Sequence, residues 1–509
     1  MRRIFAKLER NQYLERGAKG HGFDGYLEVS IGDGSQYLST PQSVDVLNAM
    51  VEELGKDPRD LKSLLTSDPN FDGPKRDWTE GIYALPFHVN KTWGRYSARN
   101  RILDTVKRVK APLHLQLNSL ASRVLFEKSS TAGSKPRATG VEFIEGKSVY
   151  KGDPRHTSRN KGTTRKVTAR KEVIISGGAF NSPQLLKLSG IGPVDELRKF
   201  DIPLVANLPG VGTNMQDNQE CVVVGLAAQP FIPTSTGPPG PACTPFHPDD
   251  PCYGPWTQGT GPYSNAGPNS NIMLLKTPHS PDGERDMTVF SGPFAFRGFW
   301  PATPNQSWPE PPTTWGMHTV KMHPQNRKGY VKLRSADPTD TPEINFNLFA
   351  EGAETDLGAI KDAIAWGRRA LRRVKGPTGP MTLTGPPCPA AVNADGTCSD
   401  AKADEEFVRS NAFGHHVTST NAIGADGDRM AVLDSKFRVR GVQGLRVVDA
   451  SVFPRIPGSF PVVATYIISE KASEAILAGV EPPPDQQGNK NHDAKAHGDG
   501  SRSCPARRL

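Results

Sequence analysis

The sequence predicts an α/β fold, and two segments far apart in the chain carry that prediction. The first is the apolar run Val173–Ile175, followed by Gly177-Gly178 and by a helix that we expect to begin at Ser182-Pro183. Serine suits the N-cap and proline the first helical position. The second is a short apolar strand over 444–449, followed by an expected helix over 461–477. A strand, a tight turn and a helix in this order form the unit of parallel α/β sheets.

The remaining elements follow from periodicity along the chain. Apolar residues at helical spacing predict helices over 44–54, 97–109 and 356–374. Alternating or continuous apolar runs predict strands over 113–117, 121–126, 138–143, 166–176 and 328–335. The region 230–312 is rich in proline, glycine and aromatic residues, so we predict a loop-heavy lobe that contacts substrate. The polar tail 481–509 is predicted to be disordered.

The chain has 509 residues, of which 36% are hydrophobic, enough to bury the cores of about two or three domains. It contains 50 glycines and 46 prolines, which indicates many turns and long irregular loops. Its apolar stretches fall short of the roughly 18 residues that cross a bilayer. We therefore expect no integral membrane segment.

The formal net charge of +9 is concentrated in one segment, residues 147–172. The rest of the chain is near neutral, and Tyr150 is the one aromatic residue in the segment. We interpret the segment as a solvated surface loop and expect no nucleic-acid partner, with a polyanion-binding patch as the alternative.

Four of the six cysteines form two closely spaced pairs. Cys243 and Cys252 are nine residues apart, and Cys388 and Cys398 are ten apart. Both pairs bracket loops rich in proline, aspartate and glycine, which a disulfide closes well. Neither pair has the spacing of a zinc knuckle or a thioredoxin-like site. We predict two disulfides and no metal site.

Two glycosylation sequons, at 90–92 and 305–307, add weak support for an oxidising destination. Together with the cysteine pairs they lead us to expect a secreted or extracellular protein. The alternative is an intracellular protein with free thiols.

Three longer motifs go beyond generic patterns. They are 177–193 (GGAFNSPQLLKLSGIGP), 207–218 (NLPGVGTNMQDN) and a C-terminal set running from Gly414-His415-His416 through Asp449-Ala450-Ser451 to Ser469-Glu470-Lys471. Together, in order and spacing, they resemble the glucose–methanol–choline (GMC) oxidoreductase family. The resemblance extends from about Tyr96 to Ala478 and is weakest between 230 and 312.

The resemblance implies a Rossmann-like FAD-binding domain interleaved with an α+β substrate-binding domain built on an antiparallel sheet. It implies FAD-dependent oxidation of an alcohol (a CH–OH donor) to an aldehyde or ketone, choline dehydrogenase-like, with oxygen or a quinone as electron acceptor. The domain boundaries it suggests are 1–32 as a remnant of the FAD domain, 33–98 as part of the substrate domain with connecting loops, 99–225 as FAD-binding, 226–409 as substrate-binding, 410–480 as FAD-binding with the catalytic segment, and 481–509 as the tail.

The proton of the alcohol needs a general base that titrates near neutrality, and histidine is the natural choice. His416 matches the family's active-site motif in 416–424, with Ser419 where glycine is usual. We therefore assign His416 as the base. His415 is expected to pack beside it or to support it.

The resemblance also implies a set of cofactor-binding positions. A helix that begins at Pro461 would place its N-terminal partial positive charge near the reduced flavin. The glycines would let the backbone approach the cofactor closely, and one strand position would contact the adenine. The expected cofactor-binding residues are Val124, Gly177, Gly178, Asp449, Ala450 and Pro461.

Two departures from the family pattern stand out. Phe460 occupies the place where the family usually has a second histidine or an asparagine, and phenylalanine cannot exchange a proton. The family also begins with a strand, a Gly-x-Gly-x-x-Gly turn and a helix that cradle the pyrophosphate. Residues 17–22 have neither that spacing nor a preceding buried strand. We therefore expect the chain to lack the N-terminal βαβ unit, and any signal peptide with it.

These departures leave a rival hypothesis from a different class. A chain without its phosphate-binding turn could be a catalytically inactive remnant that only binds a small molecule or a partner. The His416 motif favours the enzyme. A nicotinamide-linked dehydrogenase is disfavoured, because the Rossmann-like signals present are those of the GMC motifs.

Overall fold

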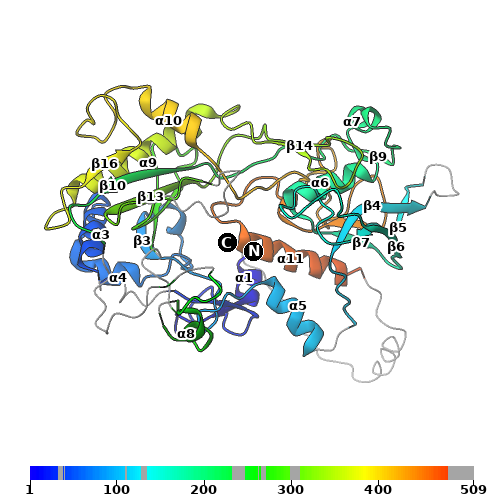
Figure 1. Ribbon diagram of the computed structural model, residues 1–509, viewed down its shortest axis with the longest axis horizontal. Helices are drawn as coiled ribbons and strands as arrows, with labels where there is room; N and C mark the ends of the chain where they lie inside the picture. The colour runs from blue at the N-terminus through cyan, green and yellow to red at the C-terminus, as the bar shows by residue number, and fades with distance from the viewer. Residues whose placement is uncertain are drawn as a thin grey trace, which may run out of the picture.

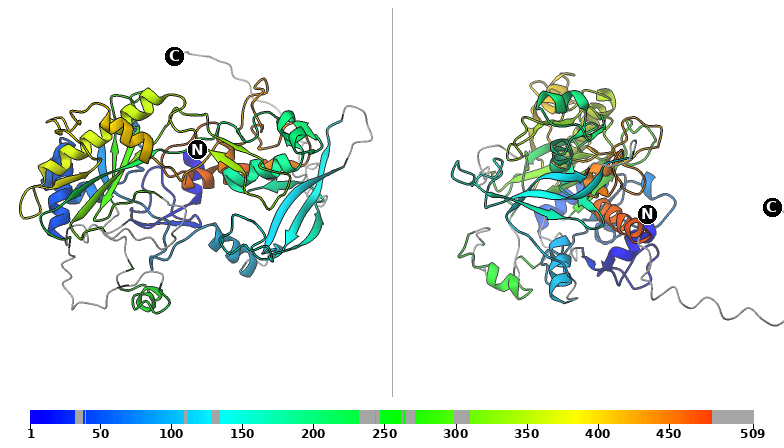
Figure 2. Two further views of the ribbon diagram at one scale, coloured as in Figure 1. Left: turned by 45° about the horizontal axis from the view of Figure 1, so that its top comes forward. Right: turned by 90° about the vertical axis from the view of Figure 1, so that its right-hand side faces the viewer.

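The computed structural model (Figure 1) describes residues 1–31, 38, 40–108, 112–127, 134–231, 243, 247–261, 263–264, 271–298 and 310–479. Its elements gather into two lobes, with helix α11 (Val462–Leu477) between them. We call them the sheet lobe, built on a six-stranded antiparallel sheet, and the α6 lobe, built around helix α6 (Gly178–Leu188). Figure 2 shows the strands of the two lobes at opposite ends of the molecule. The predicted α/β class is confirmed.

The sheet lobe has the strand order β16-β10-β13-β12-β11-β3. These strands are Gly81–Ala84 (β3), Glu220–Leu226 (β10), Asn271–Leu275 (β11), Met287–Gly292 (β12), Thr314–Lys321 (β13) and Thr382–Gly385 (β16). Helix α9 (Ala353–Arg373) packs on β10 and β13, and α3 (Pro41–Glu53) packs against α9. Trp315 and Met317 of β13 lie fully buried in the core. The antiparallel sheet that the family resemblance implied is present.

The α6 lobe contains a three-stranded antiparallel sheet of β4 (Ser119–Glu127), β5 (Arg137–Glu145) and β6 (Thr163–Thr168). Beside it, β7 (Val173–Ile175) pairs in parallel with β17 (Leu445–Val447), joining segments about 270 residues apart in sequence. Helix α6 follows β7 directly and covers β4. This parallel pair is the α/β unit that the sequence predicted.

The other elements connect and cover these lobes. They are α1 (Arg2–Leu8), β1 (Glu9–Asn11), β2 (Leu27–Val29), α4 (Leu61–Leu65), α5 (Ala98–Lys107), α7 (Val194–Lys199), β8 (Ile191–Gly192), β9 (Ala206–Asn207), α8 (Tyr253–Thr257), β14 (Tyr330–Lys332), β15 (Glu343–Asn345) and α10 (Ala403–Asn411). Among the described residues, no helix is long and apolar enough to span a bilayer. The domain boundaries stay a prediction, and the tail 481–509 and the sequon 305–307 lie outside the described residues.

Most predicted helices are confirmed, but α6 begins earlier than expected. It starts at Gly178, in the left-handed region with φ of +81°, so Ser182-Pro183 lies inside the helix. Proline has no N–H, which leaves the carbonyl oxygen of Ala179 without its intrahelical donor. The Thr420 hydroxyl donates to that oxygen at 2.7 Å instead. A tertiary contact therefore accommodates the proline that the sequence placed at the helix start.

One strand prediction was wrong, one predicted strand is divided into two, and two strands were missed. The leucines of 113–117 alternate as in a strand, but the segment is irregular and Leu117 is 73% exposed. An extended segment becomes a strand only when a neighbour supplies hydrogen bonds, and none does so among the described residues. The run 166–176 is divided between β6 and β7. Strands β11 and β12 lie in 230–312, which we predicted to be loop-heavy, because runs this short carry no decisive periodicity.

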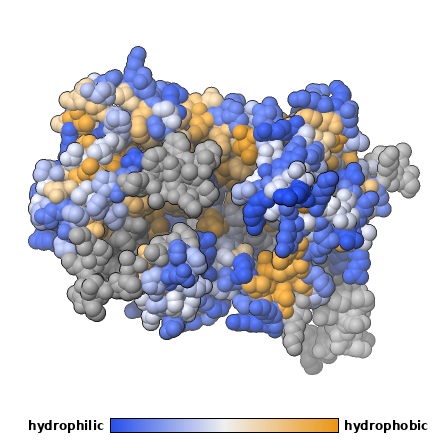
Figure 3. Space-filling model, in the orientation of Figure 1, coloured by the Kyte–Doolittle hydropathy of each residue, from blue (hydrophilic) through white to orange (hydrophobic). Residues whose placement is uncertain are grey.

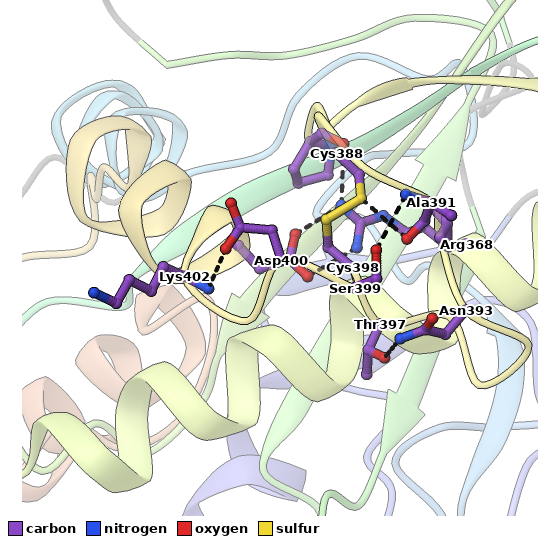
Figure 4. Close-up of a disulfide and its surroundings, with 12 residues drawn as sticks. Arg368, Cys388, Ala391, Asn393, Thr397, Cys398, Ser399, Asp400 and Lys402 are labelled. Carbon is purple, nitrogen blue, oxygen red and sulfur yellow. Dashed lines mark hydrogen bonds and ion pairs between the residues drawn. A yellow bond between two sulfur atoms is a disulfide. The ribbon is translucent and has the colours of Figure 1, made fainter.

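Both predicted disulfides are formed. Cys243 and Cys252 have their Cα atoms 5.4 Å apart, and Cys388 and Cys398 have theirs 5.6 Å apart. Figure 4 shows the second disulfide above the buried Arg368 of α9. The Arg368 guanidinium binds the Asp404 carboxylate with two hydrogen bonds of 2.7 and 2.8 Å. The disulfide loop therefore closes over a buried ion pair in the sheet lobe.

Candidate active site

A cavity of about 650 Å³ lies between the N-terminal end of α11, helix α5 and the segment 415–417. Its walls are mostly apolar and include Ile102, Phe460 and Val462, with His415 and His416 exposed to it. On the face shown in Figure 3, apolar residues gather around α5 and α11. The cavity therefore combines an apolar surface with two titratable rings.

The segment that carries the two histidines is fixed from the sheet lobe. Phe413 and Glu220 exchange backbone hydrogen bonds of 2.8 and 3.2 Å at the start of β10. A Cβ atom at Gly414 would lie 2.4 Å from the Asp217 carboxylate, so only glycine fits there. The same carboxylate accepts a 2.7 Å hydrogen bond from the backbone N–H of His416. These contacts hold His416 before any ligand arrives.

The ring of His416 has a polar and an apolar neighbour. Its Nδ1 atom lies 3.2 Å from Oε1 of Glu220, without the angles of a hydrogen bond. Its other side meets Phe460 edge to face, with ring centroids 5.3 Å apart. Burial lowers the pKa of His416 to about 4. The imidazole is therefore neutral at physiological pH, which is the form that accepts a proton.

His415 lies directly beside His416, with ring centroids 4.0 Å apart. Its Nε2 atom is 3.6 Å from Oε1 of Glu220, and its side chain is 31% exposed. Burial lowers the pKa of His415, while the Glu220 charge acts in the opposite direction. The structure thus brings together both histidines that the sequence singled out.

Two carboxyl groups at this site were not predicted. Asp217 and Glu220 are buried at the start of β10, and burial raises the pKa of each to about 7. Neither oxygen of Glu220 has a hydrogen-bond partner. A sequence signal existed, because one acid at the end of the glycine motif 207–218 and another just after it precede the apolar run 221–224. Acids next to a buried strand are candidates for function when a cleft lies beside them.

The two single-residue departures noted in the sequence acquire a structural meaning. Ser419, where the family usually has glycine, adopts the left-handed region with φ of +79°. That region favours glycine, so Ser419 carries a small conformational cost. Phe460 also has a positive φ, +56°, and points its ring at His416. The position usually held by a proton-exchanging residue therefore provides an apolar wall here.

The predicted cofactor-binding residues fall into one main group. Gly177, Gly178, Asp449 and Ala450 lie at the carboxyl ends of β7 and β17, where α/β proteins bind their ligands. The Asp449 carboxylate accepts from the Gly178 N–H at 3.0 Å and from the Ser182 hydroxyl. Its side chain therefore ties the two strand ends together.

The remaining two cofactor positions differ from each other. Pro461 caps α11 at the cavity, where the N–H groups of the first helical turn have no intrahelical acceptor. Val124 is buried on β4, and its N–H donates to the Ser189 hydroxyl at 2.8 Å. Its backbone donor is thus already used within the protein.

The residues at the cavity fit the ring end of a flavin. A helix N-terminus, an apolar wall and a neutral imidazole meet there, as an anionic reduced flavin and an alcohol would require. At the phosphate end, residues 20–25 do have the spacing Gly-x-Gly-x-x-Gly. Our prediction that this spacing is missing had considered only residues 17–22. However, strand β2 follows it instead of a helix, and Cβ atoms at Gly22 and Gly25 would overlap the carbonyl oxygens of Ala6 and Leu8. The backbone of that turn therefore packs against α1.

Comparisons with known proteins identify the family that has this fold and these motifs. Two family models, both described as GMC oxidoreductase, match residues 68–220 and 324–469. The oxygen-dependent choline dehydrogenase of Klebsiella pneumoniae is 30% identical over 458 residues, covering 89% of this chain and 72% of that protein. The chain belongs to the GMC oxidoreductase family, whose cofactor is FAD.

Another relative is the glucose methanol choline oxidoreductase atC of Aspergillus terreus, 33% identical over 374 residues. That match covers 72% of this chain and 54% of the relative, so the chain spans about half the length of this protein. Among solved structures, a variant of Aspergillus oryzae formate oxidase studied for its FAD modification has a TM-score of 0.69 at 19% identity. The structural match covers 94% of this chain and 77% of the formate oxidase chain, which shows a shared fold.

Proposed function

We propose that this chain carries the catalytic site of an FAD-dependent enzyme that oxidises an alcohol to an aldehyde or ketone, with His416 as proton acceptor. The observation that carries the proposal is the neutral, buried His416 ring at the N-terminal end of α11 in an apolar cavity. When bound, FAD supplies a hydride acceptor. The alcohol then loses a hydride from carbon and a proton from oxygen, and these two losses balance the formation of the carbonyl group.

The residues of the chain have separate roles in this proposal. His416 takes the hydroxyl proton, and the imidazolium that forms is stabilised when the nearby Glu220 is ionised. Asp217 fixes the His416 backbone, and Gly178 with Asp449 shapes the strand ends that would face the cofactor. Pro461 and the first turn of α11 would hold the flavin ring.

The cavity also suggests a substrate class. Phe460 presents an apolar face beside His416, and Tyr26 and Tyr466 add further aromatic surface to the cavity. An apolar or aromatic alcohol suits such walls better than a sugar, which needs many hydrogen-bond partners. Oxygen or a quinone would accept the electrons afterwards.

An anaerobic screen of alcohols tests the proposed function. FAD-loaded protein is mixed with aryl, aliphatic and sugar alcohols, and the flavin absorbance is followed. We expect bleaching with at least one aryl or aliphatic alcohol and the appearance of the matching carbonyl compound. Bound flavin that no alcohol bleaches would favour the alternative, a catalytically inactive binding protein.

We also propose a secreted or extracellular location. Two disulfides that close short loops support it, because such bonds persist in oxidising compartments. Non-reducing peptide mapping of protein from its native source tests this point. Free thiols at all four positions would remove the support.

A further inference from the structure

We propose that Glu220, His415 and His416 form a binding site for a divalent transition metal ion such as Zn²⁺. The ligand atoms of these three side chains all lie within 4.8 Å of one another. This proposal goes beyond the oxidation of alcohols, and the cysteine spacing had predicted no metal site. It rests on the placement of atoms around one point next to the cavity.

The distances match those of a metal centre. Oε1 of Glu220 lies 3.2 Å from Nδ1 of His416 and 3.6 Å from Nε2 of His415. In a tetrahedral zinc site with bonds of about 2.1 Å, neighbouring ligand atoms are about 3.4 Å apart. Two imidazoles and one carboxylate are also the ligand set of zinc sites that keep a fourth position open. Here the fourth position would face the cavity.

Glu220 provides the second, independent observation. Its side chain is 1% exposed, and both carboxylate oxygens lack a hydrogen-bond partner. Among the residues that the structure describes, the only basic groups within ion-pair distance of this carboxylate are the two histidines. Nδ1 of His416 likewise lacks a hydrogen-bond partner. A buried carboxylate without a donor is costly, and a cation between these atoms would satisfy it.

The site is also rigid and accessible. Backbone hydrogen bonds between Phe413 and Glu220 fix the distance between the histidine segment and β10. Asp217 holds the backbone of His416. Both histidines line the cavity of about 650 Å³, so an ion has an entry path. A bound ion on Nδ1 of His416 would leave the proton of the neutral imidazole on Nε2, so the ring could no longer accept a proton. The metal would therefore inhibit the proposed reaction.

Cobalt absorption spectroscopy tests the site without FAD or alcohol, so its failure is distinct from failure of the proposed function. The protein is stripped with a chelator and titrated with Co²⁺. We expect a visible band that saturates at one equivalent and disappears when Zn²⁺ is added. Glu220→Gln, His415→Asn and His416→Asn should each bind at least roughly 100-fold more weakly, since losing a ligand costs more than losing a supporting residue.

The surface pair His279 and Asp362, 2.7 Å apart, supplies a matched control. Asp362→Asn should leave the band unchanged. Circular dichroism checks that each variant is folded. Because the His415 side chain is partly exposed, we expect His415→Asn to disturb folding least. Absence of a band, a band that persists in His415→Asn or Glu220→Gln, or a band lost in Asp362→Asn would each overturn the proposal.

Discussion

The sheet lobe and the α6 lobe differ in how completely their strands are covered. Every residue of β11 and β13 is buried, and helices α9 and α3 complete the core on that side. In the α6 lobe every residue of β6 is exposed, and Ile174 in the middle of β7 is 45% exposed. The exposed residues of β6 are mostly polar, as expected for a strand that faces solvent. One lobe thus has a closed core, and the other leaves its outer strands open to solvent.

This difference separates the two halves of the candidate site. The acid–base residues depend on the sheet lobe, because Asp217 just before β10 and Glu220 at its start hold the segment of His415 and His416. The cofactor-facing turns, by contrast, depend on the strand ends of the α6 lobe. We therefore expect changes near β10 to affect proton transfer and changes near β7 to affect cofactor binding. The following predictions test that separation.

The largest expected effect is on catalysis. His416→Ala in the FAD-loaded protein should slow flavin reduction by alcohol by about 10²–10⁴-fold while the flavin stays bound, because a positioned base contributes that much. Rapid mixing separates this step from reoxidation. His415→Ala should cost less, and Phe460 offers no replacement acceptor. If His416→Ala reduces its flavin as fast as the parent while His415→Ala does not, the base is assigned to the wrong histidine.

The next effect concerns stability in the sheet lobe. Asp404→Ala leaves the Arg368 guanidinium buried without its carboxylate, and this should lower the free energy of unfolding by about 3–5 kcal/mol. The matched change in the α6 lobe is Glu145→Ala, opposite the exposed Arg165. It should cost at most about 1 kcal/mol. Urea unfolding of both variants makes the comparison, and equal losses would contradict the difference between the lobes.

A smaller effect appears as a pH dependence of the sheet-lobe core. His318 is buried between Phe290 and Phe294, and burial lowers its pKa to about 3. Its Nε2 atom accepts the Phe296 N–H at 2.8 Å, so protonation would break that bond. A lowered histidine pKa means that protons bind the unfolded chain preferentially. The contribution of neutral His318 to stability is therefore fully present above pH 6.5 and is lost as the pH falls below that value.

At pH 5 this loss amounts to about 2 kcal/mol, since one pKa unit corresponds to about 1.4 kcal/mol. His318→Asn, which stays neutral, should lack that part of the pH dependence. Unfolding curves at pH 7 and pH 5 for both proteins give the difference directly. An equal loss on acidification in the variant would show that His318 does not titrate in this way.

Much of the fold was predictable because the local sequence patterns agreed with the tertiary contacts. Helix α9 and strands β4 and β5 carry clear periodicity, and both cysteine pairs bracket short loops. The errors arose where a distant partner decides the outcome. Residues 113–117 look like a strand, but no strand lies beside them in the described part of the chain. Helix α6 starts early, where Asp449, about 270 residues later, accepts from the Gly178 N–H. Periodicity carries no information about such partners.

In the candidate site, too, some residues could be recognised from local sequence and others depend on distant contacts. The two histidines could be recognised because they follow one another in a motif of 414–424. Glu220 carried only a local signal, an acid directly before an apolar run. Its place beside His416, about 195 residues later, depends on the pairing of Glu220 with Phe413. Spacing along the chain predicts chemistry within one segment. A site assembled from two lobes needs the fold.

The smallest expected effect tests whether the strands of the two lobes differ in how completely they are buried. Ile174→Ala on the exposed centre of β7 should change the free energy of unfolding by less than about 0.5 kcal/mol, as is usual for surface positions. The same substitution at Ile82, which is fully buried on the edge strand β3, should cost about 2–5 kcal/mol, because it leaves a cavity. Both residues lie on short strands, so the two positions differ mainly in how deeply the side chain is buried. A loss at Ile174 as large as that at Ile82 would mean that another part of the protein, or a second molecule, covers β7 in solution.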